Sequence, residues 1–259
     1  MRPLAELDSR GVKAVLVDID ETLTTRGRLT ADAYAALERL HSHGRIVVPV
    51  TGRPAGWCDH IARMWPVDAV VGENGAFYFF YSDGRLHKRF LEDGAARAQK
   101  RARLDEIAMR ILRDIPGSAL AADQAYRETD LAIDYCEDVP ALPLGAAERI
   151  AALMEERGLK AKISSIHVNG WFGSYDKLAT SRLAFAERFA LDLDASNREC
   201  VFVGDSENDA PMFGFFQNSV GVANVRRFES RLAAAPKYVT REAAGAGFVE
   251  LAEHLLGRD

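Results

Sequence analysis

Residues 13–24, KAVLVDIDETLT, decide the fold that this sequence predicts. Residues 14–17 are apolar and two of them are β-branched valines, which favours a short strand buried on both faces, as in a parallel sheet. Three acidic side chains, Asp18, Asp20 and Glu21, come directly after this strand. We therefore expect them at its carboxyl end, where open α/β sheets bind their ligands.

Asp18 and Asp20 carry carboxylates that point the same way if the backbone between them stays extended. Two carboxylates at this spacing repel each other unless a cation or a proton offsets one of the charges. A hard divalent ion with oxygen ligands is the simplest remedy. Taken alone, the motif is equally compatible with a strand that ends in a solvated acidic turn.

The composition is that of an ordinary globular protein. The chain has 259 residues, 48% apolar and 27% charged, which allows one large domain or two modest ones. A net charge of −5 without any block of like charges argues against a nucleic-acid partner. No signal peptide or membrane-spanning run is visible, and three well-separated cysteines fit a reducing compartment. We expect a cytoplasmic protein; its oligomeric state is not readable.

Strands and helices alternate in the first and the last part of the chain. The predicted helices cover residues 31–43, 55–64, 177–189 and 247–256. The predicted strands cover residues 14–17, 46–50, 67–71, 200–203, 219–222 and 237–239. This alternation is typical of a doubly wound, Rossmann-like parallel sheet of the α/β class.

The alternation breaks between these two parts. Residues 82–85 predict a hairpin turn between strands over 76–81 and 86–90. Further helices are predicted over residues 95–114 and 144–157, with strands near 119–122, 131–135, 160–163 and 166–168. Helices and strands in these numbers suit a small α+β layer. We therefore predict a core made of residues 1–82 and 170–259, with an inserted α+β domain over residues 83–169.

Four groups of polar residues would meet at one edge of the predicted sheet, because parallel strands all end on the same side. They are D-x-D-x-T at residues 18–22, Thr51 in a T-G-R turn, Lys177 at a helix start, and G-D-x-x-N-D at residues 204–209. This combination resembles the haloacid dehalogenase-like superfamily of phosphohydrolases over nearly the whole chain. The insertion resembles the class II, subclass B cap of the Cof-like and sugar-phosphatase members.

The resemblance implies a Mg²⁺-dependent phosphomonoester hydrolase that works through an aspartyl-phosphate. Asp18 would attack phosphorus in line, and Asp20 would protonate the leaving alkoxide and then activate water. Mg²⁺ would be held by the Asp18 carboxylate, the Asp20 backbone carbonyl and Asp205. An aspartate at the second position argues for a phosphatase rather than an ATPase or a dehalogenase.

The resemblance also assigns residues to the phosphoryl group. Thr51, the Gly52 N–H and Lys177 would bind its oxygens, with Lys177 acting as a point charge. Supporting polar roles fall to Thr22, Ser206, Asn208 and Asp209. Lys177 is also compatible with an ordinary surface lysine, and Asp209 with a helix N-cap.

Substrate specificity is expected from the inserted domain, which would close over the site and exclude water. Glu73 and Asn74 resemble family positions that face the substrate. Arg127 and Lys162 are candidates for contact with a second anionic group on the substrate. The remaining candidates are polar residues that include Ser165, His167 and Asn169, the last two as readers of hydroxyls. Each of these residues is also compatible with a surface position on a half-exposed sheet.

The expected substrate is a small phosphorylated metabolite, either a sugar phosphate or a phosphoglycerate- or phosphoglycolate-type compound. One position departs from the family, since Glu21 stands where many relatives have glycine. Two other functions remain open: a phosphomutase of the phosphomannomutase type and, from another class, a non-catalytic phosphate-binding module.

Overall fold

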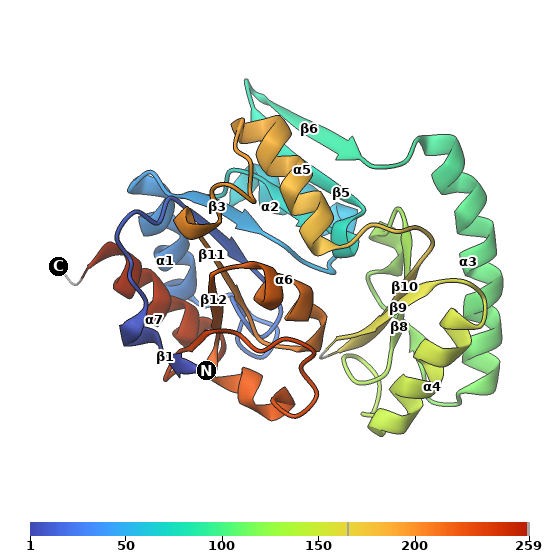
Figure 1. Ribbon diagram of the computed structural model, residues 1–259. Coiled ribbons are helices and arrows are strands. Elements are labelled where there is room, and N and C mark those ends of the chain that lie inside the picture. The colour runs from blue at the N-terminus through green and yellow to red at the C-terminus, as the bar shows by residue number, and fades with distance from the viewer. Residues whose placement is uncertain (165, 258–259) are drawn as a thin grey trace.

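The computed structural model describes residues 1–164 and 166–257, and its centre is a parallel sheet (Figure 1). The sheet is six-stranded, in the order β1-β13-β12-β11-β2-β3. Its strands are Arg2–Pro3 (β1), Ala14–Val17 (β2), Ile46–Pro49 (β3), Cys200–Gly204 (β11), Asn218–Gly221 (β12) and Tyr238–Val239 (β13). Neighbouring strands all pair in parallel, which confirms the predicted α/β core.

Alternate residues of β2 face two different hydrophobic layers. Val15 and Val17 face one layer, and Ala14 and Leu16 face the other, with all four side chains buried. The first layer contains helices α1 (Ala31–Ser42) and α7 (Ala244–Leu256), and the second contains α5 (Lys177–Phe189) and α6 (Ala210–Phe215). Burial on both faces explains why residues 14–17 read as a continuous apolar run.

The parallel sheet is joined to a three-stranded antiparallel sheet by one bridge between Val50 and Val71. Its strands are Val70–Gly72 (β4), Phe77–Ser82 (β5) and Arg85–Phe90 (β6), and helix α2 (Ala55–Met64) packs against them. The boundary predicted at residue 83 falls in the β5–β6 hairpin. Because β6 pairs with β5 as far as Phe90, we propose to place the division after Phe90.

The inserted segment has a sheet and a hydrophobic core of its own (Figure 1, right). The sheet is antiparallel in the order β7-β8-β10-β9. Its strands are Ala119–Leu120 (β7), Asp130–Asp134 (β8), Lys160–Ile163 (β9) and His167–Trp171 (β10), and its helices are α3 (Gly94–Asp114) and α4 (Leu144–Glu155). This is the α+β layer that the sequence predicts. Among the helices described here, none is long and apolar enough to cross a membrane.

Two elements, β4 and α7, begin three residues away from the predicted start. Strand β4 starts at Val70 rather than residue 67. The preceding Asp68 makes two hydrogen bonds to Val47 of β3 instead: its N–H donates to the Val47 carbonyl, and its carboxylate accepts from the Val47 N–H. Helix α7 starts at Ala244 rather than residue 247. Its first turn is hard to predict from the sequence because it contains glycines at positions 245 and 247, and glycine is a poor helix former.

Gly75 allows helix α5 to approach the core closely. It lies in the short 3₁₀ turn Glu73–Gly75 (η2) with φ +107°, and a Cβ there would lie 2.2 Å from the carbonyl oxygen of Asp176. Asp176 caps α5 by accepting a hydrogen bond from the Ala179 N–H. The Thr180 hydroxyl donates to the Gly75 carbonyl at 2.5 Å. These contacts fix the start of α5 and therefore the position of Lys177.

A left-handed conformation costs an L-residue about 1–2 kcal/mol. We predict that Gly75→Ala lowers the free energy of unfolding by more than this amount. The additional loss comes from the backbone contact at Asp176. Gly84→Ala is the matched control, because Gly84 has φ +73° and open space around its Cα. Urea unfolding measures both. An equal loss in the two variants would contradict the close approach.

Candidate active site

The carboxyl ends of three neighbouring strands bring the predicted site residues together. Asp18 follows β2, which lies between β3 and β11, and its N–H donates to the Val203 carbonyl at 2.9 Å. Thr51 follows β3, and its N–H donates to the Val71 carbonyl at 2.9 Å. Asp205 follows β11 directly. Since the chain leaves β2 in one direction and returns through β11 on the other side, this edge is a topological switch point.

Lys177 is buried between two carboxylates. Its Nζ lies 2.7 Å from Asp18 Oδ1 and 2.9 Å from Asp209 Oδ1. All three residues are at least 95% buried. Burial alone lowers the pKa of Lys177, but the charges of Asp18 and Asp209 outweigh it and raise that pKa. Lys177 therefore stays positively charged, and it is not the surface lysine that the sequence left open.

Three buried carboxylates form a group that suits a divalent cation. Oxygens of Asp18, Asp205 and Asp209 lie within 4.8 Å of one another. Burial raises the pKa of Asp18 from 3.8 to about 7, and it raises the pKa of Asp205 well above its usual value. One ammonium faces three carboxylates, so the group carries excess negative charge. Carboxylate oxygens in such a cluster are the ligands that Mg²⁺ prefers, and the residues fit this ion.

Asp205 is oriented by two side chains. The Thr22 hydroxyl donates to Asp205 Oδ1 at 3.3 Å, and the Asn224 amide donates to Asp205 Oδ2 at 3.0 Å. The same amide donates to the Glu21 carbonyl at 3.0 Å. Sequence reasoning missed Asn224. Its signal is its place after β12, at the same sheet edge as the other site residues.

Glu21 occupies a backbone conformation that favours glycine. Its φ is +55°, in the left-handed region, which glycine adopts without steric cost. The side chain turns away and accepts a hydrogen bond from the Gly27 N–H at 3.2 Å. The departure therefore leaves the D-x-D-x-T turn intact.

Asp209 supports the loop after β11 as well as Lys177. Its Oδ2 accepts hydrogen bonds from the N–H groups of Asp205 and Ser206, at 3.1 and 3.4 Å. It stands at the N-cap position of α6, but its side chain does not cap that helix. Nearby, the Ser206 hydroxyl donates to the Asn208 side-chain oxygen at 2.7 Å.

The carboxylate of Asp20 is turned toward Arg53 rather than toward the other acidic side chains. Arg53 Nη2 donates to Asp20 Oδ1 at 2.8 Å. The Arg53 N–H also donates to the Thr51 hydroxyl oxygen at 3.0 Å, which leaves the hydroxyl proton of Thr51 free to donate. Arg53 was missed as a site residue, although the T-G-R turn contains it, because a turn motif alone does not show where the side chain points.

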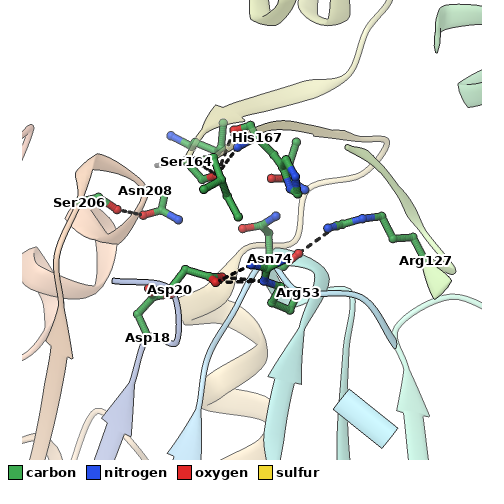
Figure 2. A pocket seen from close by; sticks show the side chains of 13 residues that line it. Asp18, Asp20, Arg53, Asn74, Arg127, Ser164, His167, Ser206 and Asn208 are labelled. Atoms are coloured by element: carbon green, nitrogen blue, oxygen red, sulfur yellow. Dashed lines mark hydrogen bonds and ion pairs between the residues drawn. The ribbon is translucent and has the colours of Figure 1, made fainter. Parts of the chain in front are cut away.

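A pocket lies between this edge and the inserted domain (Figure 2). From the core it is lined by Asp18, Asp20, Gly52, Arg53, Asn74, Ser206 and Asn208, and from the insertion by Arg127, Lys162, Ser164, Ile166, His167 and Asn169. Figure 2 shows Ser164 and His167 across the pocket from Asp18 and Asp20. Most predicted site residues thus line one enclosed space.

Two nitrogen donors at this pocket are not used inside the protein. The Asn74 side-chain nitrogen is buried and has no hydrogen-bond partner among the described residues. Lys162 is exposed and has no ion-pair partner within residues 1–164 and 166–257. In contrast, the Asn169 amide donates to Asp130 at 3.0 Å, and His167 Nε2 lies 2.8 Å from Glu137 Oε2.

Glu73 does not line the pocket, which corrects the prediction that it faces the substrate. Its carboxylate accepts hydrogen bonds from the N–H groups of Glu128 and Thr129, at 2.9 and 2.7 Å, and of Asp130 at 3.2 Å. It also accepts one from the Ala55 N–H at 2.9 Å. Glu73 therefore fastens the insertion to the core.

Arg127 lines the pocket but brings no net positive charge to it. Its guanidinium contacts Asp123 Oδ1 and Asp130 Oδ1, both at 3.0 Å, and the Gly52 carbonyl at 2.9 Å. Two carboxylates already pair with one guanidinium, which corrects the expectation that Arg127 offers its charge to a substrate anion. Ser165, another predicted contact, lies outside the described residues.

We predict that the metal-free protein loses stability as pH rises from 3.8 to about 7. In this window the unfolded chain has released protons that folded Asp18 and Asp205 still hold, so the free energy of unfolding falls with pH. Urea unfolding in chelator at several pH values measures this slope. Asp18→Asn should flatten it, and Mg²⁺ should stabilise wild type more near neutral pH than near pH 4. A slope of the opposite sign would contradict the raised pKa values.

Comparisons with known proteins give a family model, two named relatives and a similar fold. Residues 15–100 match the family model described as haloacid dehalogenase-like hydrolase. A phosphoglycolate phosphatase of Methanoculleus marisnigri is 26% identical over 92% of this chain and 94% of its own. A phosphoglycolate phosphatase of Archaeoglobus fulgidus is 28% identical, over 94% and 96% of the two chains. A crystal structure from Thermoplasma acidophilum, 19% identical, covers 95% of this chain and 98% of its own with a TM-score of 0.71.

Proposed function

We propose that this chain, a phosphatase that belongs to the haloacid dehalogenase-like hydrolases, is a Mg²⁺-dependent phosphomonoester hydrolase acting through an aspartyl-phosphate. One observation carries the proposal. Asp18 stands at the carboxyl end of β2, with Lys177 Nζ at 2.7 Å and two further buried carboxylates beside it. This arrangement combines a nucleophile, a fixed cation and a place for a divalent ion.

Asp18 is the nucleophile in this proposal. Lys177 binds Asp18 Oδ1, so Oδ2 is the oxygen that we assign to attack on phosphorus. Lys177 and the Thr51 hydroxyl face the phosphoryl oxygens and offset the charge that spreads over them in the transition state. These donors are set in place by strand ends and a helix start, so they need little rearrangement during the reaction.

Asp20 is the acid and base. It donates a proton to the leaving alkoxide as the ester bond breaks, and it later takes a proton from the water that attacks the aspartyl-phosphate. The Asp18 carboxylate, the Asp20 backbone carbonyl and Asp205 would hold Mg²⁺, with Asp209 beside them. Bound there, Mg²⁺ supplies Lewis-acid stabilisation and offsets the repulsion between Asp18 and the phosphate.

For the substrate, we propose a short phosphorylated hydroxy acid of the phosphoglycolate or phosphoglycerate kind, with a sugar phosphate as the other class. The names of the two relatives support the first class. The pocket supports it as well, because two donors that line it are unused: Lys162 on the inserted side and the Asn74 amide on the core side, beside Gly52. We propose that a carboxylate on the substrate binds Lys162.

We expect wild type to release phosphate from a narrow set of phosphate monoesters only when Mg²⁺ is present, and Asp18→Asn to release none. The reason is that the amide cannot form the aspartyl-phosphate. The panel contains 2-phosphoglycolate, 3-phosphoglycerate and glucose 6-phosphate. Asp59→Asn, a surface carboxylate paired with Arg63 and Lys88, is the control and should keep activity.

Absence of phosphate release from every member, in folded protein that binds Mg²⁺, would overturn the hydrolase proposal. Assays with sugar bisphosphate activators would then test the phosphomutase alternative. Release that persists in Asp18→Asn would contradict the aspartyl-phosphate route while leaving the phosphatase activity in place.

We predict that Lys162→Met raises KM for 2-phosphoglycolate by about 10- to 100-fold, the worth of a charge-assisted hydrogen bond, and changes KM for 2-hydroxyethyl phosphate little. The two esters differ only in the carboxylate. Lys160→Met is the matched control on the same strand, because Lys160 already donates to the Ser174 carbonyl at 2.9 Å. Equal effects of Lys162→Met on both esters would rule out recognition of a carboxylate by Lys162.

A further inference from the structure

Arg53 is a buried arginine that contacts carboxylates from both parts of the molecule. Toward the core, its Nε and Nη2 donate to Asp20 Oδ1 at 3.0 and 2.8 Å, and Nε lies 3.1 Å from Oδ2. Toward the insertion, Nη2 donates to Glu137 Oε1 at 2.9 Å and Nη1 to Asp123 Oδ2 at 3.4 Å. A single guanidinium thus links the proposed acid and base to the inserted domain.

The two carboxylates of the insertion are themselves held in place. The N–H of Glu137 donates to Asp134 Oδ1 at 2.7 Å, which fixes the turn after β8, and the Glu137 carboxylate lies 2.8 Å from His167 Nε2. Asp123 accepts from Arg127 Nε at 3.0 Å and from Nη2 at 3.1 Å. The insertion therefore presents a preformed pair of carboxylates to Arg53.

Stacking on the core side fixes the plane of the guanidinium. The Arg53 group lies over the Trp57 ring, 4.4 Å from its centroid. A planar fork that stacks on one face and donates along its edges to three carboxylates is specific to arginine, since lysine offers only a point charge. Arg53 is 4% exposed, so its guanidinium is closed off from solvent, while the Asp20 and Glu137 side chains are 21% and 27% exposed.

We propose that Arg53 is a positioning residue, which orients the Asp20 carboxyl for proton transfer. It does so only while Glu137 and Asp123 of the inserted domain hold the Arg53 guanidinium. This inference rests on the proposed phosphatase function. Asp20 passes one proton to the alkoxide as the ester P–O bond breaks and the Asp18–phosphorus bond forms. Water returns one proton to Asp20 as the Asp18–phosphorus bond is hydrolysed. Arg53 exchanges no proton and acts through the orientation of Asp20.

The test compares two esters that differ in their need for an acid. The leaving phenolate of 4-nitrophenyl phosphate is weakly basic and needs little protonation, whereas the alkoxide of 2-phosphoglycolate needs a proton. We expect Arg53→Met to lower kcat/KM for 2-phosphoglycolate by about 10²–10⁴-fold, the usual worth of general acid catalysis, and for 4-nitrophenyl phosphate by less than about 10-fold. The first irreversible step sets kcat/KM, so the second half-reaction does not enter.

Two further variants separate orientation from folding. Arg53→Lys keeps the charge but not the fork, and it should lose activity toward 2-phosphoglycolate nearly as strongly as Arg53→Met. Glu137→Gln weakens the link from the insertion while leaving the Arg53–Asp20 pair, and it should lower kcat/KM for 2-phosphoglycolate alone. Arg127→Met is the matched control, a buried arginine of the same network without contact to Asp20, and it should affect both esters alike.

Equal losses for the two esters in Arg53→Met, with a thermal unfolding midpoint close to wild type, would overturn the inference and leave Arg53 as a structural link. Full rescue by Arg53→Lys would overturn it too, since charge alone would then suffice. Failure of the proposed function is distinguishable, because wild type itself would then release no phosphate from either ester.

Discussion

The buried ammonium of Lys177 is the interaction on which the rest of the site depends. It lies 2.7 Å from Asp18 and 2.9 Å from Asp209, two carboxylates that approach a third, Asp205, in a region closed to solvent. Without this cation, Asp18 and Asp209 would be buried with no positively charged partner at hydrogen-bond distance, which is costly for any buried carboxylate. Helix α5 must therefore begin where it does, and the close contact at Gly75 makes that position possible. The position of helix α5 and the charge balance of the site therefore both depend on Lys177.

The sequence predicts the core of the site well because strand ends are easy to locate. A buried parallel strand reads as an unbroken apolar run, and polar residues that follow such runs share one edge of the sheet. This logic predicts that Asp18, Thr51 and Asp205 lie together, and the fold brings them to one edge. The α+β insertion is predictable for a similar reason, since the alternation of strand and helix breaks where it begins.

The same logic cannot find the direction of a side chain in a loop. Glu73 and Arg127 are polar residues near the sheet edge that carries the site. The side chains of both nevertheless form contacts between the core and the insertion. Arg53 stands in a turn that the sequence identifies, but its three carboxylate partners lie 33, 70 and 84 residues away. Pairings over such separations depend on how two domains dock, and a single sequence carries no local signal for them.

The three-residue turn Glu73–Gly75 serves the core, the insertion and helix α5 at once. Glu73 holds the insertion, Asn74 directs its amide into the pocket, and Gly75 admits the helix that carries Lys177. Because these duties fall on consecutive residues, a change at one position disturbs its neighbours. Descendants of this protein that acquire new substrates are thus constrained at this turn.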